Sequence, residues 1–307
     1  MNFLITGGAG FIGSHLAEAL QQVGGVRILD NQRTGNLRNL DGLNAPFING
    51  SVLDRETVAA CMQGVDCVFH LAAMVSVPES VQSPRECQEI NGVGLLNVLE
   101  AAAAAGVRKV FLASSAAVYG DNPAVPKEES MLPEPKSPYA YTKLLGEHCC
   151  RFFHEEGKVR TVCLRFFNVF GPRQDPRGAY AAAVPIFMER ALRGEDIIVH
   201  GDGGQTRDFI FVKDIVAAIL HVTLTPEITG VFNAGYGLTT TVRSLAEEII
   251  RLSGSRSRIV CGPVRPGDVR HSRAAVERLA ATGFKPTGSL ESGLAETLAW
   301  WRNQMPD

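Results

Sequence analysis

The sequence predicts an α/β fold built on a doubly wound parallel sheet, and two observations carry this prediction. Short apolar runs at residues 66–71, 109–113 and 161–165 alternate with helical stretches at about 84–105 and 139–156. Strands that are apolar along their whole length are typical of a parallel sheet with helices on both faces. The 307-residue chain is long enough to bury such a core.

The regular alternation of strands and helices ends after Arg165. There a loop rich in glycine, proline and arginine leads into a mixture of short helices and strands. This change indicates a second, smaller lobe. We expect a main sheet domain of residues 1–169 plus about 206–234, and a substrate lobe of about 170–205 plus 235–307.

The first strand of the expected sheet, residues 2–6, runs directly into a glycine-rich turn and then into a helical pattern at about 14–22. Gly7 permits the tight turn, Gly10 lets the backbone approach a pyrophosphate, and Gly13 lets the helix pack close to the strand. A diphosphate would face the free N–H groups of the helix. Strand, glycines and helix in this order predict a dinucleotide site.

The second strand, residues 26–30, ends in an acid. A carboxylate at this position accepts hydrogen bonds from a ribose 2′-OH and repels a 2′-phosphate, so Asp30 favours NAD over NADP. Arg33 is close enough to pair with such a phosphate, which leaves NADP open. Asp30 could also serve only as a turn or capping carboxylate.

Tyr139 and Lys143 lie four residues apart, a spacing that places two side chains on one face of a helix. Ser137 is a suitable N-cap and Pro138 suits the first turn, so the helix should begin at the tyrosine. A phenol, with a reference pKa of ~10, is a poor base at neutral pH, and an ammonium one turn away would lower that pKa. The pair predicts an acid/base for a hydroxyl proton, the alternative being a surface tyrosine and a solvated lysine.

The composition excludes several classes of function. A formal net charge of −2 gives no reason to expect a nucleic-acid or membrane partner. Seven cysteines without metal-type spacing indicate reduced buried thiols and no metal site. The first strand leaves no room for a signal peptide, and no apolar run is long enough to span a bilayer. We expect a cytoplasmic protein.

Ser114 and Ser115 follow the strand at 109–113, at the carboxyl end of the sheet, where doubly wound folds hold ligands. The chain carries a set of motifs that are specific in combination: Gly7-Gly-Ala-Gly10-Phe-Ile-Gly13, His70-Leu-Ala-Ala73, Ser114-Ser115, Tyr139 with Lys143, Arg165-Phe-Phe-Asn168, Arg207-Asp208 and Arg265-Pro-Gly-Asp268. Together they resemble the extended short-chain dehydrogenase/reductase family, and within it the UDP-glucose/UDP-N-acetylglucosamine 4-epimerases. The resemblance covers essentially the whole chain.

This resemblance implies a Rossmann-type sheet with a smaller C-terminal substrate lobe, an NAD cofactor and a UDP-hexose substrate, N-acetylated and uronic acid forms included. Ser115, Tyr139 and Lys143 match the catalytic positions, where the tyrosine takes the C4 hydroxyl proton and a 4-keto sugar forms. The positions matching dinucleotide contacts are Gly7, Gly10, Phe11, Ile12, Gly13, Asp30, Asn31, Ser51, Val52, Leu71, Ala72, Ala73, Asn91, Tyr139, Lys143 and Phe166. Those matching nucleotide-sugar contacts are Ser76, Ser115, Asn168, Ala183, Val184, Ile198, His200, Arg207, Arg265, Asp268 and Ser272.

The resemblance also implies that Arg207 and Arg265 meet the UDP diphosphate, which suits the planar fork of guanidinium. For His200 a strand-end surface histidine is an equal alternative. A homodimer built from the helices at about 91–105 and 139–156 is implied as well. The apolar character of those helices is equally consistent with packing on their own sheet.

The chain departs from the family pattern at several positions. Ser51 stands where an aspartate usually holds the adenine amino group, and Val75 replaces a lysine found in some epimerases. Ser76 and Ser272 resemble the forms that leave room for a 2-acetamido group, so we expect the site to accept UDP-N-acetylglucosamine.

Two alanines favour an epimerase over its sister enzymes. Dehydratases carry an acid pair directly after the serine/threonine position, and decarboxylases commonly carry a glutamate there. This chain has Ala116 and Ala117, whose methyl groups can move no proton. The alternatives are another sugar-nucleotide enzyme, such as a dehydratase or decarboxylase, and a non-catalytic NAD-binding sensor.

Overall fold

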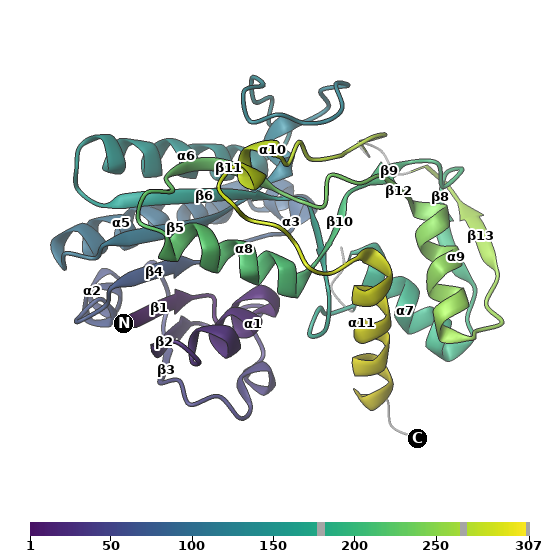
Figure 1. Ribbon diagram of the computed structural model, residues 1–307, viewed down its shortest axis with the longest axis horizontal. Helices are drawn as coiled ribbons and strands as arrows, with labels where there is room; N and C mark the ends of the chain where they lie inside the picture. The colour runs from purple at the N-terminus through teal and green to yellow at the C-terminus, as the bar shows by residue number, and fades with distance from the viewer. Residues whose placement is uncertain (177–181, 265–268, 305–307) are drawn as a thin grey trace. The chain divides into compact units, whose positions relative to one another are not determined.

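The computed structural model describes residues 1–176, 182–264 and 269–304, and Figure 1 traces the chain. The chain folds as two compact units. The first comprises Met1–Gly120, Met131–Phe166 and Val216–Phe232, and the second comprises Asp121–Ser130, Phe167–Ile215 and Asn233–Asp307.

The first unit is built on a seven-stranded sheet with the order β11-β6-β5-β4-β1-β2-β3. The strands are β1 (Asn2–Thr6), β2 (Gly25–Asp30), β3 (Phe47–Asn49), β4 (Cys67–His70), β5 (Lys109–Ser115), β6 (Arg160–Phe166) and β11 (Gly230–Ala234). Strand β1 pairs in parallel with both β2 and β4, so the winding direction reverses at β1. A doubly wound sheet binds its ligand beyond the carboxyl ends of the strands at such a reversal. The predicted fold class is confirmed.

Helices cover the sheet on both faces, as parallel strands require. Those of the first unit are α1 (Phe11–Leu20), α2 (Arg55–Cys61), α3 (Val77–Gln82), α4 (Pro84–Gln88), α5 (Gly94–Ala104) and α6 (Pro138–Glu155), with the short η1 (Leu37–Leu40), the π-helix η2 (Glu89–Val93) and the 3-10 helix η3 (Ala116–Tyr119). Helix α8 (Val212–Leu224) crosses from the second unit into the first. No helix in the described ranges combines the length and apolar character needed to cross a bilayer.

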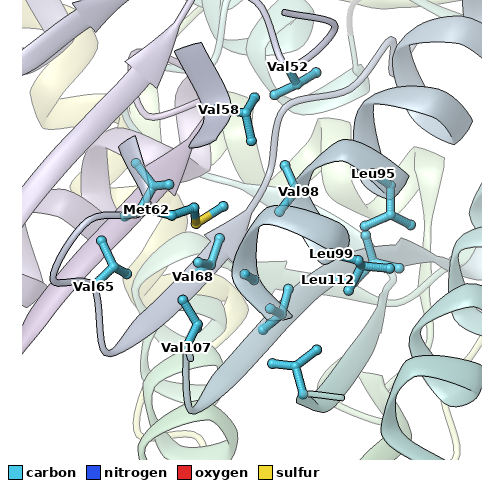
Figure 2. Packing of buried hydrophobic residues seen from close by; sticks show 14 of the residues in the cluster. Val52, Val58, Met62, Val65, Val68, Leu95, Val98, Leu99, Val107 and Leu112 are labelled. Carbon is cyan, nitrogen blue, oxygen red and sulfur yellow. The ribbon is translucent and has the colours of Figure 1, made fainter. Parts of the chain in front are cut away.

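An apolar cluster fixes α2, α5 and α6 on one face of the sheet (Figure 2). Val58 of α2, Val98 and Leu99 of α5 and Val68 of β4 are all completely buried. Burial of this kind stabilises the fold by roughly 25 cal/mol per Å² of apolar surface. The opposite face carries a row of rings, and at the end of this row the ring of Phe166 stacks on Phe111 with centroids 6.2 Å apart.

Within its described residues the second unit carries three two-stranded sheets, which pair β10 with β7, β12 with β9, and β13 with β8. Its elements are β7 (Asn168–Phe170), α7 (Ala183–Arg193), β8 (Ile197–His200), β9 (Thr206–Arg207), β10 (Phe209–Phe211), β12 (Thr240–Thr241), α9 (Val242–Ser253), β13 (Ile259–Gly262), α10 (Glu277–Ala280) and α11 (Leu290–Gln304).

The predicted domain boundaries place residues 121–130 in the main domain, whereas the compact units place them in the second. The reason is visible in the backbone. The Lys127 N–H donates to the Arg273 carbonyl at 2.8 Å, and the Lys127 carbonyl accepts from the Ala275 N–H at 2.9 Å. The boundaries themselves stay a prediction.

Candidate active site

The turn after β1 and the first turn of α1 leave no room for a side chain at Gly7 or Gly13. Gly7 has φ +74°, in the left-handed region, and a Cβ there would lie 2.6 Å from the backbone nitrogen of Ala72. A Cβ on Gly13 would lie 2.2 Å from the carbonyl oxygen of Gly7. Gly10 is the N-cap of α1 and makes no side-chain hydrogen bond to it, so the N-cap leaves the first N–H groups of the helix available. This bare turn fits the backbone approach that a pyrophosphate needs.

Asp30 ties the end of β2 to the glycine turn. Its side chain is buried, and its oxygens accept from the backbone N–H groups of Ala9 at 2.9 Å and Gln32 at 2.7 Å. Each carboxylate oxygen can accept more than one hydrogen bond, so a ribose hydroxyl could still donate to this group. The residues present therefore fit NAD, and the negative charge disfavours a 2′-phosphate.

The π-helix η2 brings Asn91 to the loop that follows β4. The Asn91 Oδ1 accepts from the Met74 N–H at 2.8 Å, and its Nδ2 donates to the Met74 carbonyl at 3.0 Å and to Thr142 Oγ1 at 2.9 Å. The amide thus fastens the segment after Ala73 to helix α6. Its predicted contact with the cofactor stays a prediction, because these hydrogen bonds all run to protein groups.

Helix α6 starts where the sequence predicts. The Ser137 Oγ accepts from the Ala140 N–H at 3.2 Å, and Pro138 occupies the first turn. The Tyr139 N–H, one of the donors that no helix can satisfy internally, donates to Ser80 Oγ at 3.2 Å. The first turn of α6 is therefore anchored to helix α3, and this anchoring orients Tyr139.

The three predicted catalytic residues come together beside the carboxyl end of β5. Ser115 is the last residue of that strand, and its side chain hydrogen-bonds to Tyr139. The Lys143 Nζ lies 5.7 Å from the centroid of the Tyr139 ring. It donates a hydrogen bond of 2.8 Å to the carbonyl of Ala113, in the same strand. A hydroxyl, a phenol and an ammonium thus converge on one point of the sheet edge.

The pKa of Tyr139 moves in the opposite direction from the one expected. Burial raises the pKa of Tyr139, and the hydrogen bond with Ser115 only opposes that rise. Burial also lowers the pKa of Lys143 to about 8. The net shift among the protein groups is therefore upward, because desolvation of the phenol is the largest influence on it. The lowering of this pKa by the charge of Lys143 stays a prediction.

A buried ion pair supports the strand that carries the serine. Arg165 Nε and Nη2 donate to Glu147 Oε1 and Oε2 at 2.9 and 2.7 Å, and Ser114 Oγ donates to Glu147 Oε1 at 2.5 Å. The guanidinium also lies 4.8 Å from the centroid of the Tyr119 ring. Glu147 thereby holds the residue next to Ser115. Its spacing of four from Lys143 is the signal by which the sequence could have revealed it.

His70 is a second supporting residue that the motifs leave without a role. It ends β4, and its Nδ1 lies 2.8 Å from Thr6 Oγ1 at the end of β1. Burial, and then the charge of Lys143, lower the pKa of His70 to about 3, so the imidazole is neutral at pH 7. His70 therefore joins two strand ends at the reversal point and contributes no charge.

Most other predicted cofactor residues lie at strand ends or in the first turn of α1, namely Phe11, Ile12, Asn31, Leu71, Ala73 and Phe166. Two differ. The Val52 side chain is buried in the apolar cluster, and Ser51 Oγ accepts from the Leu53 N–H at 3.2 Å. A contact from Val52 would have to be made by its backbone.

The predicted nucleotide-sugar residues divide between the two units. Ser76 caps α3 in the first unit, where its Oγ accepts from the Glu79 N–H at 3.2 Å. In the second unit Ser272 lies beside β9, since its N–H donates to the Thr206 carbonyl at 3.1 Å, next to Arg207. The others there lie on β7, α7 and β8: Asn168, Ala183, Val184, Ile198 and His200. The Val184 side chain is buried, and Arg265 and Asp268 lie outside the described residues.

Comparison with known proteins decides the family. The model of the NAD dependent epimerase/dehydratase family matches residues 3–235. The chain belongs to this family. Its members carry out more than one reaction, so the family alone does not select one.

Two solved structures of this family resemble the chain along its whole length. One is the UDP-N-acetylglucosamine 4-epimerase from Methanobrevibacter ruminantium, in complex with UDP-N-acetylmuramic acid, with 39% identity over 99% of each chain and a TM-score of 0.96. The other is the Thermus thermophilus UDP-glucose 4-epimerase in complex with NAD, with 36% identity over 99% and 100% of the two chains and a TM-score of 0.92.

A relative with a different activity is similar to the same degree. The UDP-N-acetyl-alpha-D-glucosaminuronate decarboxylase of Bacillus cytotoxicus is 37% identical in an alignment that covers 97% of each protein. Overall identity therefore does not separate epimerase from decarboxylase, and the residues of the site must do so.

Proposed function

We propose that this family member catalyses the NAD-dependent 4-epimerisation of a UDP-hexose through a 4-keto sugar. The observation that carries the proposal is that Ser115, Tyr139 and Lys143 form a cluster, while the two residues directly after Ser115 are Ala116 and Ala117. An epimerase needs one acid/base at the C4 hydroxyl, which this cluster supplies. A dehydratase or decarboxylase would need a further acid or base where η3 presents two methyl groups.

The residues have separate tasks in this proposal. NAD, when bound, supplies the hydride acceptor for oxidation at C4 and a positively charged nicotinamide ring. As a phenolate, which the positive charges of Lys143 and of the nicotinamide ring would stabilise when NAD is bound, Tyr139 accepts the C4 hydroxyl proton and returns it after the 4-keto sugar has presented its other face. Ser115 hydrogen-bonds to the same sugar oxygen and keeps it in line with the phenol. Lys143 holds positive charge beside the ring of Tyr139.

We also propose which groups recognise the substrate. Arg207 and Arg265 would grip the UDP diphosphate, whose oxygens match the paired donors of guanidinium. Ser76 and Ser272 are small, so an N-acetylated hexose is among the expected substrates. A solved epimerase of the family that binds UDP-N-acetylmuramic acid supports this expectation.

A homodimer through α5 and α6 is the third part of the proposal. These two helices contact each other and expose large apolar side chains, namely Val93 just before α5, Leu96 on α5, and Tyr141, Leu145 and Phe152 on α6. Tyr141, Leu145 and Phe152 recur at helical spacing and so share one face of α6. A second copy of the chain would cover this apolar surface.

The decisive experiment is product analysis by NMR after incubation with UDP-glucose, UDP-galactose, UDP-N-acetylglucosamine and UDP-glucuronic acid. Epimerisation converts one of these substrates into its C4 epimer and leaves C6 unchanged. Loss of the C6 hydroxyl would indicate a dehydratase, and release of CO₂ a decarboxylase. NAD binding without conversion of any of these UDP-sugars would contradict the proposed function and leave the sensor or an enzyme for a sugar attached to another nucleotide.

A further inference from the structure

Arg33 is held by two carboxylates of the helices that follow β4. Its Nη2 lies 3.0 Å from Glu79 Oε1 on α3 and 2.8 Å from Glu86 Oε1 on α4. Burial works against the charge of this guanidinium, but the hydrogen bonds with Glu86 and Glu79 outweigh it and raise the pKa of Arg33. All three side chains belong to the first unit.

Arg33 lies in the loop that can discriminate between NAD and NADP. The loop after the second strand of a dinucleotide-binding sheet distinguishes a ribose 2′-hydroxyl from a 2′-phosphate, and an arginine there can accommodate the phosphate. Arg33 is three residues beyond Asp30 in this loop. Gln32, between them, has φ +58°, and the Arg33 N–H donates to Asn31 Oδ1 at 3.2 Å. In this loop conformation the Arg33 guanidinium reaches Glu79 and Glu86.

We propose that Glu79 and Glu86 are specificity-determining residues that withhold Arg33 from a 2′-phosphate. With its guanidinium paired, the loop presents only the Asp30 carboxylate to the ribose, and that carboxylate selects the 2′-hydroxyl of NAD. Both carboxylates contact the same nitrogen, Nη2, so a 2′-phosphate could bind there only by displacing them, and at the other guanidinium nitrogens it would meet their negative charges. This inference rests on the proposed NAD site and adds the residues that exclude NADP from it.

A competition experiment tests the proposal without measuring turnover. Purified protein is equilibrated with an equal mixture of NAD⁺ and NADP⁺, and the ratio of the two dinucleotides retained is measured by liquid chromatography. The variant Glu79→Gln/Glu86→Gln should raise the retained NADP⁺/NAD⁺ ratio by about tenfold, because a freed guanidinium can form a charge-assisted hydrogen bond with phosphate. Adding Arg33→Ala should return the ratio to the wild-type value.

A matched control removes the same charge elsewhere. Glu89 and Glu155 are exposed carboxylates of the same unit, and no ion pair joins either to Arg33 among the described residues. The variant Glu89→Gln/Glu155→Gln should leave the ratio unchanged. Because all four glutamates lie at the surface, thermal unfolding should confirm that each variant is folded.

The outcomes separate the two hypotheses. An unchanged ratio in a Glu79→Gln/Glu86→Gln protein that still retains NAD⁺ overturns this inference and leaves the proposed function standing. A ratio that rises but stays high after Arg33→Ala overturns the inference in the same way. A wild-type protein that retains neither dinucleotide contradicts the proposed function and this inference together.

Discussion

The glycine turn after β1 and the first turn of α6 are two parts of one site that work in opposite ways. The turn is defined by the side chains it lacks, since a Cβ at Gly7 or Gly13 would strike backbone atoms. The start of α6 is defined by the side chains it holds, with Tyr139 hydrogen-bonded to Ser115 and Lys143 to Ala113. Changes in the turn should therefore act through sterics, and changes in α6 through charge.

The largest expected effect is on the chemical side. Tyr139→Phe removes the hydroxyl that takes the C4 proton, and it should lower turnover by ~10²–10⁴-fold, the usual contribution of a positioned acid/base. Tyr141→Phe is the matched control, because Tyr141 lies two residues further along the same helix and is exposed. Steady-state kinetics with the substrate identified by NMR measure both. Near-normal turnover of Tyr139→Phe would remove this residue from its role.

The steric side is tested by Gly13→Ala. The new methyl group would lie 2.2 Å from the Gly7 carbonyl oxygen, and the backbone around it must shift. We expect the free energy of unfolding to fall by about 1–3 kcal/mol. The comparison is Gly10→Ala, whose Cβ would lie 3.2 Å from the same oxygen and should cost less. Urea unfolding of both variants is the measurement, and equal losses would contradict the steric account.

The smallest effect concerns the dependence of stability on pH. The pKa of Lys143 is about 8 in the folded protein, below the ~10.4 of an exposed lysine, so between these values the unfolded chain binds more protons. The penalty for burying the ammonium is therefore full below pH ~8 and relieved as the pH rises towards ~10.4. Relative to Lys143→Met, the wild type should gain about 1 kcal/mol of stability per pH unit in this window.

The control for the pH experiment is Lys285→Met, which removes an exposed ammonium from the second unit. Urea unfolding at several pH values between about 8 and 10 gives the slopes. The Lys285→Met protein should keep the slope of the wild type. Parallel curves for the wild type and Lys143→Met would show that Lys143 is not the source of the dependence.

Local spacing explains why so much of the site was predictable. The strand–glycine–helix order of β1 and α1, the cap at Ser137 and the four-residue offset of Tyr139 and Lys143 are all read within a few residues. The carboxyl-end rule then brings Ser115 to the same edge of the sheet. These features need no knowledge of long-range packing.

The parts that could not be predicted depend on contacts between distant segments. Glu147 and Arg165 pair across helix α6 and strand β6. The spacing of four from Lys143 points to Glu147 but does not identify Arg165 as its partner. The rise in the pKa of Tyr139 comes from burial, which only packing determines. Similarly, the sequence alone suggests that Arg33 could bind a 2′-phosphate. Its ion pairs with Glu79 and Glu86 follow only from the fold.

In the π-helical turn Glu89–Val93, the number of residues is as important as their identity for the position of the Asn91 side chain. Such a turn holds an extra residue compared with regular α-helix, and each residue of a helix turns the chain by about 100°. Deleting one residue here would let α4 run smoothly into α5, but Asn91 would swing away from Met74 and Thr142. Related proteins should therefore exchange side chains in this stretch far more readily than they gain or lose a residue.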